Sequence, residues 1–186
     1  MRQLLLLLSA LALLAAAASC SAASNPAAQP AAVGSAIPLA SPAFGEGQTI
    51  PQEHTCAGAD LSPALSWEQV PAGTKSLALT CTDADAGGFV HWLLYGLPPA
   101  TRELPAGLPT TETLPNGARQ GTNDFGRLGY GGPCPPPGKA HHYVFKLYAL
   151  DTELTLPPKA RVADLTRAMA GHILGEGQLT GQYTSR

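Results

Sequence analysis

The chain has 186 residues, only 13% of them charged, and its formal net charge is −2. This balance does not provide the basic surface that nucleic acid requires, so we expect no nucleic-acid partner. The length suits one domain with a sizeable core, and the 20 glycines and 18 prolines favour a fold with many turns.

Residues 1–19 have the pattern of an export signal. Arg2 supplies a positive charge, and the apolar run Leu4–Leu14 is too short to span a bilayer as a mature helix. Small residues then precede Cys20 and resemble the lipobox of bacterial lipoproteins, although Ala17 replaces the usual leucine. We expect lipidation of Cys20. The alternative is ordinary signal-peptidase cleavage in the same alanine-rich run.

Residues 20–42 are predicted to form a flexible tether rich in alanine, proline and serine. They carry no charge, no periodicity and few large side chains, so they bury too little apolar surface to offset the entropy of ordering. We expect a folded domain over residues 43–186, held through Cys20 to a membrane of the bacterial cell envelope. Ser21 favours the outer membrane in a two-membrane cell. Without the lipid, the protein is expected to be periplasmic or secreted.

Short apolar runs alternate with turn signals along the domain. Ser76–Cys81 alternates in polarity, and His91–Pro98 and His142–Asp151 are rich in aromatic and aliphatic residues, as strands are. Apolar residues at helical spacing predict one helix within Val162–Ile173, which Gly175 can end. The sequence therefore predicts a mainly β fold, an antiparallel β-sandwich with a short C-terminal helix. No βαβ alternation indicates a parallel sheet.

Ionisable residues stand at the ends of these runs. Asp83 and Asp85 have equal parity, so both side chains can point the same way, and His91 opens the next run. His141 and Tyr143 also share parity, about 6.6 Å apart along a strand. Neighbouring strand ends can therefore bring Asp83, His91, His141 and Tyr143 together.

Three chemistries compete for these four residues. A metal site lacks a strong ligand spacing, and a hydrolytic triad lacks a nucleophile elbow, so we expect no metal and no cofactor. A small anion pocket fits best, because imidazoles and a phenol can donate to phosphate. For any one of these residues taken alone, hydrogen bonding to buried backbone is the favoured explanation.

Two long blocks, Thr80–Pro98 and Gly131–Asp151, resemble the signature blocks of the phosphatidylethanolamine-binding protein family, in its bacterial Raf-kinase-inhibitor-like branch. The flanking segments Phe44–Trp67 and Ala170–Tyr183 are similar to that branch as well. The resemblance implies a sandwich of antiparallel sheets with a pocket at one end for phosphate or phosphoryl head groups.

By position, the resemblance assigns ligand binding to Asp83, His91, His141 and Tyr143, and a supporting role to Asp85 and His142. It implies no catalytic residue. Two family prolines are replaced by Ala84 and Gly87, which loosens the pocket rim. The family arginine is replaced by His142, which lacks a fixed fork of donors. These departures bear on which ligand is held.

The cysteines other than Cys20 allow one intramolecular bridge. Cys81 alternates with Leu77 and Leu79, as a core residue does, so we expect a buried thiol there. Cys56 and Cys134 lie in turn-rich loops, which the resemblance places near the pocket end, and export favours disulfides. We expect Cys56 and Cys134 to pair.

We expect a cell-envelope module that binds a small phosphorylated or anionic ligand and that acts as a regulator or inhibitor of a protein partner. Kinase inhibition is not carried over, because a fold does not fix a partner. The alternative is a weak phosphoester hydrolase with His91 or His141 as the base and Asp83 as its orienting group. The lack of a nucleophile or metal motif counts against an enzyme.

Overall fold

The computed structural model describes residues 34–157 and 159–185. The predicted export signal, Cys20 and residues 21–33 of the predicted tether lie outside the described residues. Within the described part of the chain, no helix is long and apolar enough to cross a membrane.

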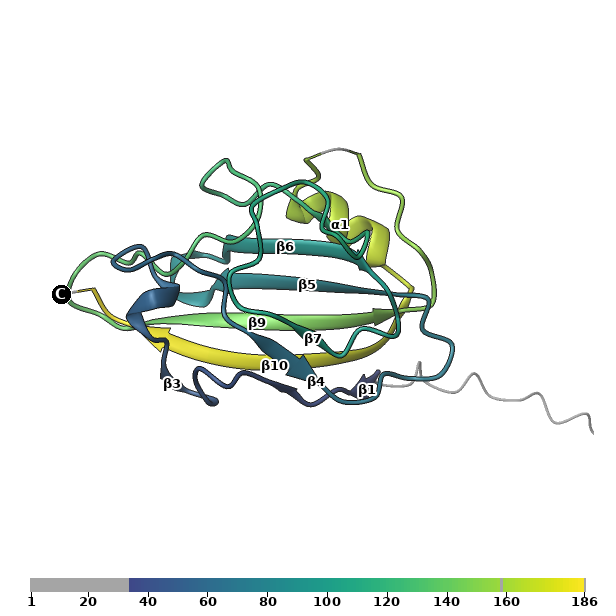
Figure 1. The fold of residues 1–186 in the computed structure, drawn as a ribbon, viewed down its shortest axis with the longest axis horizontal. Coiled ribbons are helices and arrows are strands. Elements are labelled where there is room, and N and C mark those ends of the chain that lie inside the picture. Colours follow the sequence, from purple (N-terminus) through teal and green to yellow (C-terminus); the bar gives the residue numbers. More distant parts are fainter. Residues whose placement is uncertain (1–33, 158, 186) are drawn as a thin grey trace, which may run out of the picture. The chain divides into compact units, whose positions relative to one another are not determined.

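A large sheet forms the centre of the domain, with strand order β1-β10-β9-β5-β6-β8 and β3 added beside β10 (Figure 1). Its central strands are antiparallel, whereas β1 and β3 pair with β10 in parallel at the outer edge. The bounds of its strands are β1 Ser35–Ala36, β3 Gln48–Thr49, β5 Ser76–Asp83, β6 Phe89–Leu97, β8 Arg119–Gln120, β9 His141–Leu150 and β10 Ile173–Tyr183.

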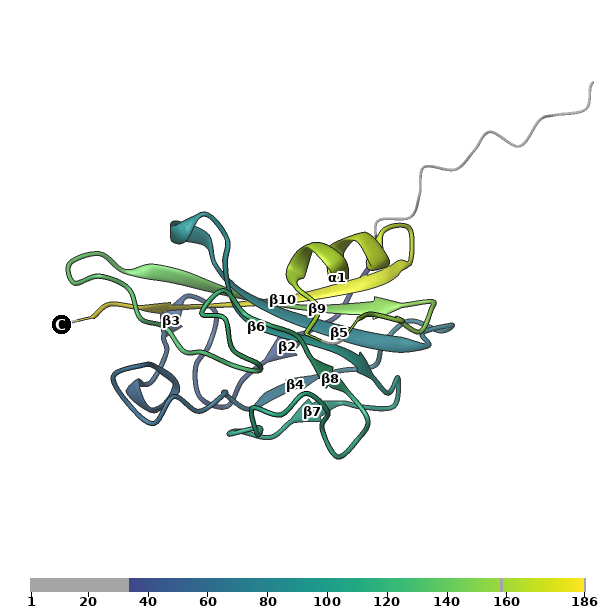
Figure 2. The same cartoon turned by 90° about the horizontal axis from the view of Figure 1, so that it is seen from above.

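A small antiparallel sheet and a helix cover the two faces of the large sheet (Figure 2). The small sheet has the order β2-β4-β7. The remaining elements are β2 Leu39–Ala40, β4 Leu65–Trp67, β7 Glu103–Leu104, the helix α1 Val162–Met169, and the 3-10 turns η1 Gln52–His54 and η2 Ala84–Ala86. The predicted mainly β sandwich with a short late helix is confirmed.

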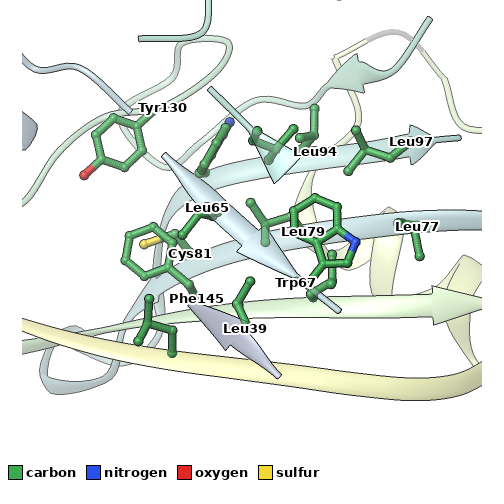
Figure 3. Packing of buried hydrophobic residues seen from close by; sticks show 14 of the residues in the cluster. Leu39, Leu65, Trp67, Leu77, Leu79, Cys81, Leu94, Leu97, Tyr130 and Phe145 are labelled. Carbon is green, nitrogen blue, oxygen red and sulfur yellow. The ribbon is translucent and has the colours of Figure 1, made fainter. Parts of the chain in front are cut away.

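Strand alternation divides the buried residues into two cores. On β5, Leu77 and Leu79 face the small sheet and pack in one cluster, while Ala78 faces α1 and belongs to the other. Figure 3 shows Trp67 of the small sheet above the β5 leucines. The core between the sheets is the larger of the two, so the sandwich rests mainly on sheet-to-sheet packing.

Helix α1 is shorter than predicted. Leu165 and Met169 are buried against the large sheet, as the helical spacing requires. The helix ends at Met169 because Gly171 adopts a positive φ of 81° and turns the chain. Ile173 therefore begins β10, and the prediction that the helix runs to Ile173 and stops at Gly175 is wrong.

The N-terminal segment of the described chain crosses the β10 edge at close range. Glycines at alternate positions of β10 permit this, because a Cβ at Gly177 would meet the carbonyl oxygen of Ile37, and one at Gly181 would meet the side chain of Ile50. Ile37 and Leu39 are buried in the core between the sheets. Residues 34–42 are therefore part of the folded domain, and the domain begins earlier than the predicted boundary at residue 43.

Candidate functional site

The strand order brings the ends of β9, β5 and β6 side by side. In the register of the sheet, Asp83 at the end of β5 pairs with Tyr143 of β9 on one side and with Phe89 of β6 on the other. Tyr143 is fully buried and Asp83 nearly so. The structure therefore unites these two predicted residues through sheet register, and it adds Phe89 to them.

His91 reaches the same place through a β-bulge. Cys81 pairs with Trp92 and Thr82 with Val90, so His91 is the extra residue on β6. Bulges redirect side chains and are frequent next to functional sites. The His91 ring meets the Tyr143 ring edge to face, with 5.0 Å between the ring centroids. The bulge thus turns His91 toward the pocket side of the sheet.

Both carboxylate oxygens of Asp83 are engaged. Oδ1 accepts the backbone N–H groups of Asp85 and Ala86, at 2.9 and 3.1 Å, and so caps η2. Oδ2 lies 2.7 Å from Nδ1 of His141, which donates to it. Asp83 therefore shapes the loop after β5 and also fixes the orientation of the His141 ring.

Asp85 and His142 lie together beside the pocket. Asp85 belongs to η2 and its Oδ2 accepts both the backbone N–H and the ring Nδ1 of His142, at 2.7 and 2.8 Å. The side-chain hydrogen bond from His142, followed by the backbone one, lowers the pKa of Asp85. Both side chains are exposed and neither lines the pocket. This contact ties η2 to the start of β9.

The predicted residues surround a small pocket of about 190 Å³. All four predicted ligand-binding residues line it, with Phe89, Phe125, Ala86, Cys134, Pro135 and Pro136 completing the wall. The Phe125 side chain is 41% exposed and packs edge to face on Phe89, with ring centroids 4.8 Å apart. The mouth of the pocket is therefore aromatic.

The sequence analysis did not identify the two phenylalanines. Phe89 has the same parity as His91, which is a signal that could have placed it at the site. Phe125 lies in a loop without periodicity, and its position depends on tertiary packing against Phe89 and His91.

Tyr143 supplies a polar group at the base of the pocket. Its hydroxyl is buried close to the Asp83 carboxylate, but it makes no hydrogen bond of good geometry to any described residue. Burial, and then the nearby Asp83 carboxylate, raise the pKa of Tyr143 well above that of an ordinary phenol. The phenol therefore stays protonated and is available as a donor.

His91 is kept neutral by its surroundings. Its ring is buried among the rings of Phe89, Phe125 and Tyr143, and burial lowers its pKa below the ordinary value. Its Nδ1 lies 2.6 Å from the carbonyl oxygen of Gly131. His91 is thus bonded to backbone and not to the Asp83 carboxylate.

A disulfide between Cys56 and Cys134 joins the loop that follows η1 to the pocket wall, and the Cα atoms of the two cysteines are 5.4 Å apart. The predicted pairing is confirmed. Cys81 is a buried free thiol whose pKa is raised by burial, as expected for a core position. The same wall is also held by Gly132, whose N–H donates to Asp60 Oδ1. The pocket wall is therefore anchored covalently and by hydrogen bonds.

Metal ligation has little support in this arrangement. Among the residues that the structure describes, no three histidine, cysteine or acidic side chains gather as a metal-binding group. The Asp83 oxygens are already occupied, and the pocket cysteine is in a disulfide. The arrangement offers a buried phenol and two imidazoles to a small ligand.

Comparisons with family models, with known sequences and with solved structures all point to the same protein family. The sequence model of the phosphatidylethanolamine-binding protein family matches residues 40–184. A UPF0098 protein of Methanothermobacter thermautotrophicus is 50% identical over 143 residues, which are 76% of this chain and 94% of the relative. A protein of Mycobacterium tuberculosis named as the lipoprotein LppC is 39% identical over 157 residues, 83% of this chain and about three quarters of the relative. None of these names describes an enzyme.

Two solved structures share the fold. YbcL of E. coli, described as a member of the mammalian PEBP family, superposes with a TM-score of 0.75 at 34% identity. The PEBP homologue CT736 of Chlamydia trachomatis superposes with a TM-score of 0.73 at 36% identity. Each match covers 81% of this chain and 99% of the other. The resemblance of the two sequence blocks is confirmed at the level of the family, and the chain belongs to the phosphatidylethanolamine-binding protein family.

Proposed function

We propose that the protein is a cell-envelope module that binds a small phosphorylated or anionic ligand in the pocket of Asp83, His91, His141 and Tyr143. The observation that carries this proposal is the buried Tyr143 hydroxyl, which lies near Asp83, makes no hydrogen bond of good geometry to any described residue, and lines the pocket with two imidazoles. A buried donor left unpaired costs about 1–3 kcal/mol. A bound oxyanion would accept this hydrogen bond and remove the penalty.

The charge balance of the pocket supports an anion. Asp83 is the pocket's carboxylate, and its charge is offset by two backbone N–H groups and by His141. The repulsion that a free carboxylate would exert on an anion is thereby reduced.

The size of the pocket limits what enters it. A volume of about 190 Å³ is below the range of roughly 300–1,000 Å³ that is usual for drug-sized ligands. We propose that only a charged head group enters, while the rest of the ligand lies over the aromatic mouth at Phe125. The exposed Phe125 ring at the rim of the pocket can also contact a protein partner. We propose that the protein regulates such a partner.

The relative named as a lipoprotein supports lipidation of Cys20 and location on a membrane of the cell envelope. In a two-membrane cell we propose the outer membrane, because Ser21 follows the cysteine. Replacement of Cys20 by alanine is expected to release the protein or leave an uncleaved precursor. Membrane binding and processing at wild-type levels would exclude Cys20 as the anchor.

One contact favours a second function, a weak phosphoester hydrolase. The Asp83–His141 pair has the geometry of a base with its orienting carboxylate. His91 does not, because its Nδ1 is bonded to Gly131. Steady turnover of phosphoesters that is lost in His141→Ala would favour the enzyme. Saturable binding without turnover would favour the binding module.

The test of the binding module is titration of the mature protein with inorganic phosphate, followed by amide chemical shifts and calorimetry. We expect the largest shifts at the four pocket residues and tighter binding at pH 6 than at pH 8. Tyr143→Phe should weaken binding about tenfold, the equivalent of one hydrogen bond to a charged ligand. Tyr95→Phe is the matched control, because its hydroxyl is also buried and unpartnered but lies outside the pocket. Shifts that cluster elsewhere, or affinity that rises with pH, would overturn the assignment.

A further inference from the structure

We infer that His91 makes the pocket selective for an oxyanion that carries its own proton, such as hydrogen phosphate or a phosphomonoester monoanion, over an aprotic anion of similar shape such as sulfate. The inference rests on the proposed anion-binding function and specifies the ligand class for the same pocket.

The first step is the position of the His91 proton. The ring Nδ1 lies 2.6 Å from the carbonyl oxygen of Gly131, and a carbonyl oxygen can only accept. The backbone holds this contact in place, because the Gly131 N–H donates back to the His91 carbonyl at 2.9 Å. Gly132 is fixed in turn by its bond to Asp60. The proton of a neutral His91 therefore lies on Nδ1.

The second step is the state of the other ring nitrogen. A neutral imidazole protonated on Nδ1 has a lone pair on Nε2, so Nε2 accepts and does not donate. The backbone of Gly132 also lies near the ring, but the only ring hydrogen bond of good geometry to a described residue is the one from Nδ1 to Gly131, and Nε2 is not among the buried atoms without a partner. Because His91 lines the pocket, its Nε2 is the atom that can meet a ligand.

The third step is the charge of the ring. The carboxylates of Asp83 and Asp124 and the carbonyls of Gly131 and Gly132 favour the protonated ring, but burial outweighs them and the pKa of His91 is lowered. The other groups packed around the ring are the aromatic side chains of Phe89, Phe125 and Tyr143, which bring no formal charge while the phenol is protonated. The acceptor state of Nε2 thus persists at neutral pH.

The ligand must match this pattern. An oxygen placed against His91 Nε2 has to donate a hydrogen bond, which the P–OH group of a phosphate monoanion can do. Sulfate at neutral pH has only acceptor oxygens, so one of them would face the Nε2 lone pair. The Tyr143 hydroxyl donates to a second oxygen in either case. Discrimination therefore arises at His91 and not at Tyr143.

The experiment compares inorganic phosphate with sulfate on the mature protein at pH 6.5 and equal ionic strength, by calorimetry and amide shifts. We expect phosphate to bind at least about tenfold more tightly, since a mismatched buried hydrogen bond costs about 1–3 kcal/mol. The advantage of inorganic phosphate should persist at pH 8, because hydrogen phosphate still carries one P–OH group. A phosphomonoester loses its last proton with a pKa of about 6, so its advantage over sulfate should be lost by pH 8. Equal affinity for the two anions, or tighter binding of sulfate, would overturn the inference and leave the anion pocket standing. Binding of neither anion would instead refute the proposed function.

The tautomer can be read directly and without a mutation. Long-range proton–nitrogen spectra of the ligand-free protein should show His91 with a protonated Nδ1 and an unprotonated Nε2. A proton on Nε2 at neutral pH would contradict the inference even if phosphate binds.

His91→Gln provides the matched variant, because an amide can either donate or accept at the same place. We expect it to bind the two anions within about threefold of each other. The control is His172→Gln, an exposed histidine outside the pocket, which should keep the wild-type preference. Preserved discrimination in a folded His91→Gln protein would show that another group selects the anion. If that variant does not fold, the phosphate–sulfate comparison and the tautomer spectra of the wild-type protein still test the inference.

Discussion

A buried aspartate–histidine pair lies at the start of strand β9 and an exposed one lies just past its end, with the same contact distance in both. At the start of β9, His141 Nδ1 is 2.7 Å from Asp83; just after its end, Asp151 is 2.7 Å from His172 Nδ1. The Asp83 and His141 side chains are 5% and 17% exposed, whereas both side chains of the other pair are 46% exposed. The same contact distance in the two pairs therefore does not imply that they contribute equally to stability.

Burial and further contacts decide the difference. Asp83 also caps η2 and lies beside the buried Tyr143, so loss of its carboxylate affects a loop and a pocket. Asp151 and His172 are in water, where an ion pair typically contributes little because it is screened and costs side-chain entropy. The four predictions below test this contrast between the pocket end and the far end of the sheet.

The largest expected effect is loss of the covalent bond at the pocket end. The double variant Cys56→Ser/Cys134→Ser should lower the free energy of unfolding by about 4 kcal/mol, because the bond closes a long loop in the unfolded chain. The sequence separation of the two cysteines is 78 residues. Chemical denaturation of the variant and of the reduced wild type measures this. Equal stability of the oxidised and reduced wild type would contradict the prediction.

Removal of the buried carboxylate comes next. Asp83→Ala should lower the free energy of unfolding by about 3 kcal/mol, since it removes a cap and leaves His141 without its acceptor. The same variant should lose the ordered His141 ring and, with it, phosphate binding. Denaturation curves and calorimetry provide the readout. Asp83→Asn, which retains an oxygen for the cap, is expected to recover part of the stability but not the binding.

The pH dependence of stability reports on His91. Its pKa is lowered in the folded protein, mainly by burial, so the unfolded chain takes up the proton more readily. The free energy of unfolding should therefore fall as the pH drops below about 6.5, the pKa of an unperturbed histidine, and be fully retained above it. His91→Gln should flatten this part of the profile. Unchanged pH dependence in that variant would assign the effect to another group.

The smallest effect is expected at the exposed pair. Asp151→Ala should change the free energy of unfolding by no more than about 0.5 kcal/mol and leave phosphate binding unaltered. Differential denaturation against Asp83→Ala in the same buffer makes the comparison direct. A loss similar to that of Asp83→Ala would show that burial is not what separates the two pairs.

The strands that build the core were predictable because their sequences have strong local signals. Alternation in β5 and the aromatic and aliphatic content of β6 and β9 mark them as strands. β10 was not predicted as a strand, because glycines at 175, 177 and 181 weaken the strand signal. These positions need glycine because residues 35–50 cross β10 so closely that a Cβ would collide with them. Local propensity cannot report a contact made by a distant segment.

The pocket residues were predicted in identity but not in geometry. Parity paired His141 with Tyr143, and both line the pocket. It also paired Asp83 with Asp85, but the strand ends at Asp83, and Asp85 lies in η2 outside the pocket. Parity cannot predict a bulge, which is why the sequence did not show how His91 joins them or that its partner is Gly131. Phe125 was missed because its loop has no periodicity.

The described chain enters the large sheet at the end opposite to the pocket. Residue 35 pairs with Gly175 near the start of β10, whereas Tyr183 at the end of β10 pairs with His141 beside the pocket (Figure 1). Eight residues of extended strand separate these points by roughly 26 Å. A spectroscopic probe attached at the exposed Ser35 would therefore report on the domain without contacting a ligand in the pocket.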